Sequence, residues 1–186
     1  MLGGGAWWLL ETRMEEVKPP VPRNRLPDHV VTDFSAVETD ETGQPERRLA
    51  ARQLRHYVKE DLSELDLPRL TVFESDSPPW QGESQTGLLL SGGDEVRLTG
   101  AARLSRASDG TSRSLRLMTE EITIWPKGEY AAGDQPVRIE SDQDWLTAAG
   151  VKLWYSTPAR AEFQGRAHIL LAPKPGPEAA SEETDP

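Results

Sequence analysis

The sequence predicts an all-β fold in which antiparallel hairpins stack as two layers. Apolar and polar residues alternate along much of residues 28–171, as in Val96-Arg97-Leu98 and Phe163-Gln164-Gly165. A period of two is typical of strands with one buried and one wet face. No apolar stripe with a period of 3.6 residues follows residue 28, so we expect no long helix. The alternation leaves a sandwich, an open barrel and a jelly roll as candidate architectures.

Two stretches need separate arguments. Residues 47–58 contain good helix formers but have no acidic first turn and no clean cap, so we predict a strand there. In residues 112–125 the apolar parity changes, from Leu115 and Leu117 to Ile122 and Ile124. A slip of one residue would turn every side chain to the other face, so we predict a bulge or break near residues 119–121.

A strand–turn–strand unit recurs along the chain. Copies start at residues 87, 121 and 150, and residues 49–73 form a looser fourth copy. Repetition at this spacing indicates one supersecondary unit laid beside itself, and here the unit is a β-hairpin.

The chain divides into three parts by composition. Residues 1–27 hold a short apolar run, Ala6 to Leu10, and a proline-rich stretch that we expect to be an extended linker. A membrane-spanning helix needs about 20 apolar residues, so this run is too short to span a bilayer. Residues 172–186 are rich in proline and acids, and we expect a disordered tail. The folded domain is predicted at residues 28–171.

Composition and motifs give no support for catalysis. The formal charge of −10 disfavours a nucleic-acid binder, and the absence of cysteine excludes thiolate zinc sites and a cysteine nucleophile. Three histidines leave little for a metal site, and no nucleophile, phosphate-loop or dinucleotide motif occurs. We expect no catalytic residue, no metal and no cofactor.

Four arginines gather within nine residues, at Arg47, Arg48, Arg52 and Arg55. Their planar donors suit phosphate and carboxylate groups, so they are a candidate site for an anion. The plainer interpretation is a wet strand face neutralised by acids at residues 40, 41 and 46.

Two other functions remain open from the residues alone. A carbohydrate-binding sandwich would use tryptophans exposed on one flat face, drawn from Trp80, Trp125, Trp145 and Trp154. A hydrolase on a sandwich would need two converging carboxylates, for which Glu120 and Asp142 are candidates.

An ordered series of short segments resembles one known family. The series is Leu26-Pro27-Asp28-His29 before a strand, Asp40-Glu41-Thr42-Gly43, Leu49-Ala50-Ala51 running to His56-Tyr57, Leu67-Pro68-Arg69-Leu70-Thr71-Val72-Phe73, and Trp80. In this order and spacing, over about residues 26–171, the chain resembles the LptC family, the inner-membrane component of the lipopolysaccharide transport bridge of Gram-negative bacteria. The repeated hairpin is also similar to the unit of the related bridge protein LptA.

The resemblance implies a single twisted, open β-jelly roll of antiparallel strands with an apolar groove, and no catalysis. It implies that lipopolysaccharide acyl chains bind in the groove, after delivery by the inner-membrane ABC transporter and before transfer to LptA. The family has a single N-terminal membrane helix with the folded domain in the periplasm, and residues 1–27 would hold only a remnant of that anchor. The inward apolar positions that would line the groove are Phe34, Leu49, Tyr57, Leu65, Val72, Leu90, Leu98, Leu104, Leu117, Ile124, Ile139, Leu153, Phe163 and Ile169.

The resemblance also implies one docking edge at each end of the domain. The strand near Val30–Val37 would face the periplasmic domains of the transporter. The C-terminal strand, at about residues 160–171, would pair edge to edge with LptA. Its candidate contact residues are Arg160, Glu162, Gln164, Arg166, His168 and Leu170.

Overall fold

The computed structural model describes residues 26–74, 77–109, 113–156 and 159–172, and its regular elements are strands and short 3₁₀ turns. The strands are β1 (His29–Thr39), β2 (Pro45–Tyr57), β3 (Leu62–Asp66), β4 (Arg69–Val72), β5 (Trp80–Glu83), β6 (Thr86–Leu90), β7 (Glu95–Arg106), β8 (Leu115–Trp125), β9 (Tyr130–Gly133), β10 (Val137–Ser141), β11 (Asp144–Ala148), β12 (Gly150–Trp154), β13 (Arg160–Gln164) and β14 (His168–Leu170). The 3₁₀ turns are η1 (Val58–Glu60), η2 (Ser91–Gly93) and η3 (Pro126–Gly128). The prediction of an all-β fold is confirmed.

The segments predicted before and after the domain lie outside the described residues, except for residues 26, 27 and 172. Among the described residues, no helix has the length and apolarity that crossing a bilayer requires.

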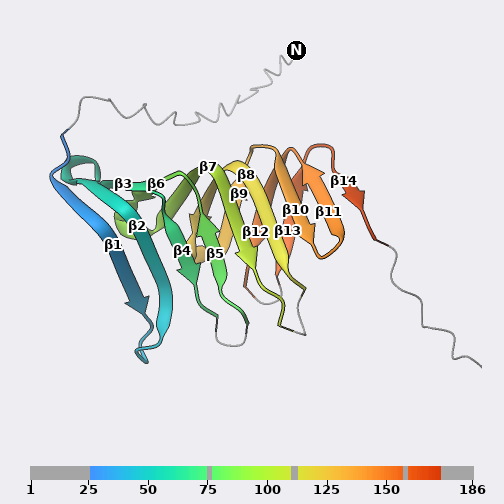
Figure 1. Cartoon of the computed structure of the whole chain (residues 1–186), viewed down its shortest axis with the longest axis horizontal. Coiled ribbons are helices and arrows are strands. Elements are labelled where there is room, and N and C mark those ends of the chain that lie inside the picture. The colour runs from blue at the N-terminus through green and yellow to red at the C-terminus, as the bar shows by residue number, and fades with distance from the viewer. Residues whose placement is uncertain (1–25, 75–76, 110–112, 157–158, 173–186) are drawn as a thin grey trace, which may run out of the picture.

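Long strands divide their pairing between two layers. The C-terminal part of β2 pairs with β3, whereas its N-terminal part pairs with β4. In the same way β7 pairs first with β6 and then with β5, and β8 pairs with β10 and then with β9. The first layer therefore contains β3, β6, β9, β12 and β13, and the second contains β4, β5, β10, β11 and β14. Figure 1 shows these strands following one another from β1, in blue, to β14, in red.

This arrangement is a β-jelly roll built from antiparallel hairpins. The three 3₁₀ turns each join two strands of a hairpin, at β2–β3, β6–β7 and β8–β9. The copies predicted at residues 87 and 121, and the looser copy at 49–73, therefore correspond to these hairpins, and the copy predicted at residue 150 corresponds to the antiparallel pair of β12 and β13.

The irregularity predicted near residues 119–121 lies between β7 and β8. Thr99 pairs with Glu121 and Ala102 pairs with Thr119, so two residues of β7 oppose Glu120 alone. The extra residue belongs to β7, where Gly100 and Ala101 have φ of +82° and +51°. A bulge increases local twist and bends the strand. It lies where β7 changes its partner from β6 to β5, between the two layers.

The middle of the space between the layers is filled by side chains. Leu98 of β7 and Leu117 and Ile122 of β8 are fully buried, and the main apolar cluster continues to Val151 and Leu153 of β12. A smaller cluster of Ala51, Leu54 and Leu65 lies toward the N-terminal end, where Phe34, Leu49 and Leu89 pack against it while remaining partly exposed. Packing is therefore complete in the centre and looser near β1 and β2.

Each end of the jelly roll presents strands with one neighbour only. Within the described part of the chain, β1 pairs only with β2, β13 only with β12, and β14 only with β11. The prediction of a single C-terminal strand over residues 160–171 is wrong in detail. The backbone turns at Gly165, with φ of +72°, so that β13 completes the first layer and β14 the second.

Candidate functional site

An apolar pocket of about 330 Å³ lies between the layers at the end formed by β1 and β2. Its wall contains Phe34 of β1, Leu49 of β2, Leu70 of β4, Leu89 of β6 and Val96 of β7. Leu70 and Val96 are only 3% and 2% exposed and belong to the main cluster, so they form the floor. The other three are half-buried. An apolar chain placed here would therefore cover surface that the protein itself leaves partly wet.

The rim of the pocket is polar. Glu38 of β1 and Arg47 of β2 are cross-strand neighbours, and their side chains form an ion pair. Within this ion pair Arg47 donates a hydrogen bond from Nε to the Glu38 carboxylate. The hydrogen bond lowers the pKa of Glu38 and raises the pKa of Arg47. Gly92 and Gly93 of η2 and Pro126 of η3 also line the pocket. The site thus combines an apolar interior with a paired charge at its mouth.

The fourteen residues predicted to line a lipid groove fall into several environments. Phe34 and Leu49 lie in the pocket wall. Six are buried in the two apolar clusters, namely Leu65, Leu98, Leu104, Leu117, Ile124 and Leu153. Val72 and Ile139 are partly buried against the main cluster. Phe163 and Ile169 are 37% and 61% exposed on the C-terminal strands. The structure therefore brings only two of the fourteen to the pocket.

Tyr57 and Leu90 share the opposite side of the first layer. Leu90 pairs with Leu62 and Glu95, and Leu62 pairs with Tyr57, whereas Leu89 aligns with Val96. Successive strand residues point to opposite faces, so Leu89 rather than Leu90 lines the pocket. The run Leu88-Leu89-Leu90 contains no polar residue that would show which of the three point inward, so sequence reasoning missed Leu89. It also missed Leu70 and the alternating Val96.

The residues predicted for the C-terminal edge are all exposed, but they lie on two separate strands. Arg160, Glu162 and Gln164 belong to β13, His168 and Leu170 belong to β14, and Arg166 lies between them. Arg160 forms an ion pair of 2.9 Å with Glu162.

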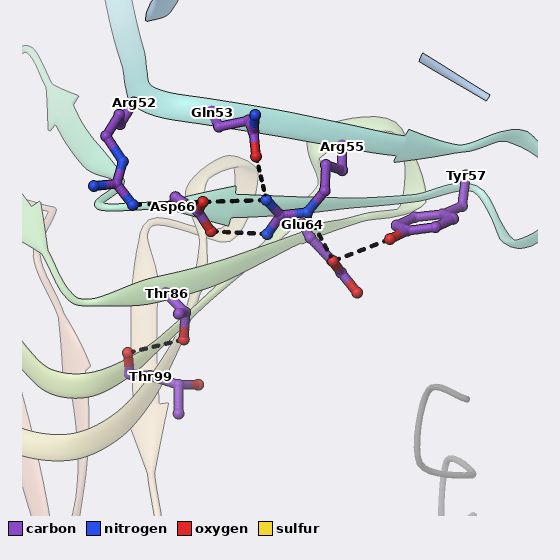
Figure 2. Close-up of polar contacts among 8 residues, drawn as sticks. All are labelled: Arg52, Gln53, Arg55, Tyr57, Glu64, Asp66, Thr86 and Thr99. Atoms are coloured by element: carbon purple, nitrogen blue, oxygen red, sulfur yellow. Dashed lines mark hydrogen bonds and ion pairs between the residues drawn. The ribbon is translucent and has the colours of Figure 1, made fainter. Parts of the chain in front are cut away.

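The four clustered arginines do not act as a unit. Arg55 donates to Asp66 at 2.8 Å and to Glu64 at 3.2 Å, and Tyr57 donates to the same Glu64 carboxylate (Figure 2). The hydrogen bond from Arg55 lowers the pKa of Asp66. Arg52 is 65% exposed beside Asp66. The neutralised-face interpretation therefore describes Arg52 and Arg55, although their partners come from β3 rather than from residues 40–46.

The structure brings together only part of the features that the two alternative functions require. Trp80 is buried at 5% exposure. Trp125 and Trp154 lie in the first layer and Trp145 in the second, and arginine or lysine side chains stack on the rings of Trp145 and Trp154. Asp142 is held ionised by Arg113, whose hydrogen bond lowers its pKa, in the turn between β10 and β11. Trp125 and Trp154 are both in register with Tyr130, so these three rings form one row on the outer face of the first layer. In this row Trp125 stacks on Tyr130, and Lys152 and Arg160 lie over Trp154.

No cluster of three or more histidine, aspartate or glutamate side chains in the described ranges is arranged to hold a metal ion.

The fold and pocket together define an open β-jelly roll with an apolar hollow at one end and strands available for pairing at both ends. Comparisons with known proteins identify the family of this chain. A family model described as lipopolysaccharide-assembly, LptC-related, matches residues 1–164. The chain belongs to this LptC family.

A solved structure supports the fold independently. The crystal structure of LptH, described as the LptA homologous periplasmic component of the lipopolysaccharide transport device of Pseudomonas aeruginosa, superimposes with a TM-score of 0.55. The similarity covers 68% of this chain and 95% of LptH at 9% sequence identity, and at this identity it supports the fold alone. No curated protein sequence matches the chain.

Proposed function

We propose that this protein is a non-catalytic, lipopolysaccharide-binding component of the transport bridge. It accepts lipopolysaccharide from the inner-membrane ABC transporter and passes it to an LptA-like protein. The observation that carries the proposal is the apolar pocket beside β1 and β2, in a jelly roll of the LptC family. Burial contributes about 0.8 kcal/mol for each methylene removed from water, so about ten methylenes contribute roughly 8 kcal/mol toward binding, part of which offsets the entropic cost of association.

The free strands support docking of a partner at each end of the domain. On β1, the apolar side chains of Val30, Val31 and Val37 are 52%, 42% and 47% exposed. At the other end, β13 and β14 carry the exposed Phe163 and Ile169. An unpaired strand edge is a ready site for addition of a partner's strand. In this proposal β1 faces the transporter, the C-terminal strands face the LptA-like protein, and the folded domain lies in the periplasm behind a membrane anchor.

Site-specific photo-crosslinking tests lipid binding. A photoreactive residue at Phe34 should crosslink to lipopolysaccharide, because its side chain lines the pocket. The same residue at Arg103, whose side chain is 57% exposed on β7, is the control and should not crosslink. Equal labelling at both positions would contradict specific binding in the pocket.

A pull-down with an LptA-like protein tests the edges separately. Phe163→Asp and Ile169→Asp place a charge on β13 and β14 and should reduce capture of that partner. Val30→Asp and Val37→Asp, on β1, should leave it unchanged and should instead weaken association with the transporter. If the β1 variants and not the C-terminal variants lose the LptA-like partner, the direction of the route is reversed.

A further inference from the structure

Arg47 ends an inward-facing row of apolar side chains. On β2, Arg47 has the same parity as Leu49 and Ala51, which pack between the layers. Its side chain is only 14% exposed, whereas that of its partner Glu38 is 51% exposed. The cation is therefore sheltered at the pocket mouth, while its counter-ion reaches solvent.

The guanidinium of Arg47 has more donors than its neighbours use. Glu38 accepts from Nε, but the buried Nη1 has no hydrogen-bond partner among the described residues. A buried donor left without an acceptor is destabilising, and more so when the group is charged. Arg47 lines the pocket, so a ligand oxygen that meets Nη1 when the guanidinium turns away from Glu38 would gain binding energy.

The remaining arginines of the cluster do not offer this. Arg55 is already bonded to Asp66, Glu64 and Gln53. Arg48 is exposed and, being adjacent in the strand, faces away from the pocket. Arg47 alone among the four lies in the pocket wall.

We infer that Arg47 anchors the acidic headgroup of an amphiphile whose apolar chain occupies the pocket, and that Glu38 competes with this headgroup for the guanidinium. The shared chemistry is a phosphate or carboxylate oxygen able to accept from Nη1. Glu38 holds the guanidinium in place when the pocket is empty and returns when the headgroup leaves. This inference rests on the proposed function and adds to it the group that recognises the headgroup and the group that makes its binding exchangeable.

Calorimetry with three soluble probes tests the inference. Dodecyl phosphate and dodecyl maltoside, both kept below their critical micelle concentrations, share a chain and differ in headgroup charge, and inorganic phosphate supplies the headgroup alone. A charge-assisted hydrogen bond is worth at least about 1.4 kcal/mol, which is tenfold in affinity. Arg47→Gln should therefore lower the affinity for dodecyl phosphate about tenfold or more and leave the affinity for dodecyl maltoside nearly unchanged.

Three further variants sharpen the result. Glu38→Gln removes the competitor and should strengthen dodecyl phosphate binding. Arg47→Lys keeps the charge without the planar fork and should retain part of the affinity. Arg48→Gln removes a neighbouring charge outside the pocket and is the matched control, which should behave as the unaltered protein. Thermal melting of each variant establishes that it is folded.

The outcomes separate the anchor from the function. If both detergents bind and Arg47→Gln weakens neither or both alike, the anchor is refuted and the apolar pocket stands. If neither detergent binds the unaltered protein, the proposed function fails together with the anchor. If inorganic phosphate alone binds as tightly as dodecyl phosphate, the site recognises a free anion and the amphiphile is refuted.

Discussion

Replacing Leu98 and Phe34 by alanine should separate the filled centre of the jelly roll from its pocket. Leu98 is fully buried among residues of both layers, whereas Phe34 is half-buried on an edge strand in the pocket wall. Truncating a buried leucine to alanine costs about 2–5 kcal/mol, through lost transfer energy and the cavity left behind. In a domain of this size, each kcal/mol lowers the melting temperature by about 2–4 °C, so Leu98→Ala should melt roughly 4–20 °C lower.

The expected pattern for Phe34→Ala is the reverse. Its ring lacks a full set of neighbours, so we expect a loss of only about 1–2 kcal/mol of stability. The same truncation removes wall area from the pocket, and a binding loss of 1–2 kcal/mol corresponds to about 5–30-fold in affinity for an amphiphile.

Urea unfolding followed by tryptophan fluorescence gives the two stabilities, and calorimetry with dodecyl maltoside gives the two affinities. The reasoning is refuted if folded Leu98→Ala loses more affinity than Phe34→Ala. That result would place the chain of the amphiphile in the centre of the jelly roll, where the structure has close-packed side chains.

Three other predictions concern the scaffold. Asp66→Asn should lower stability by about 1 kcal/mol at pH 7, because the hydrogen bond from Arg55 holds the pKa of Asp66 in the folded protein below its usual value. A lowered pKa stabilises the folded state above the pKa of the unfolded chain, and this stabilisation is lost as the pH falls through the folded-state pKa. The difference in urea midpoint between the two proteins should therefore vanish in strong acid. Glu83→Gln, in the exposed pair with Arg103, is the control and should change the midpoint little. Gly133→Ala should destabilise the protein more than Gly82→Ala, by about 1–3 kcal/mol. The new Cβ at position 133 would meet the Glu121 carbonyl oxygen at 2.8 Å, whereas the Cβ at position 82 would meet leucine methyl groups at 3.1–3.2 Å, which can shift. Equal melting temperatures for the two variants would contradict this. Backbone amides of β1 should exchange hydrogen faster than those of β7 and β8, because only Phe34 of β1 is even half-buried; slower exchange in β1 would show that an unseen contact protects it.

Alternation in the sequence predicts strands well because burial on one face imposes a period of two. Residues 47–51 show this, since Arg47, Leu49 and Ala51 share one parity, and the segment is strand despite its helix-forming composition. The inward parity changes between Ala51 and Leu54. The parity change in β8 likewise reflects a real bulge. Its extra residue lies on β7, because a parity change records that two strands slip relative to each other and not which strand holds the insertion.

Alternation cannot distinguish a packed interior from an open one. Leu98 and Phe34 are both inward apolar residues on strands, yet one is fully buried and the other lines a pocket. The difference depends on how many strands face each residue across the two layers, which is a property of the pairing order. Leu89 and Leu90 show the same limit locally, because a continuous apolar run carries no parity until the register with Val96 is known.

The position of the pocket follows from the way the jelly roll ends. In the centre, β7 and β8 have partners on both sides and in both layers, and large side chains from each layer fill the space. At β1 the second layer stops at a strand with one partner, so Phe34 and Leu49 have fewer side chains opposite them and a hollow remains. The same strand end brings Glu38 and Arg47 to the rim, which places a charged pair beside the hollow. A partner strand added to β1 would extend this wall, and an apolar chain could then move along a continuous surface without entering water.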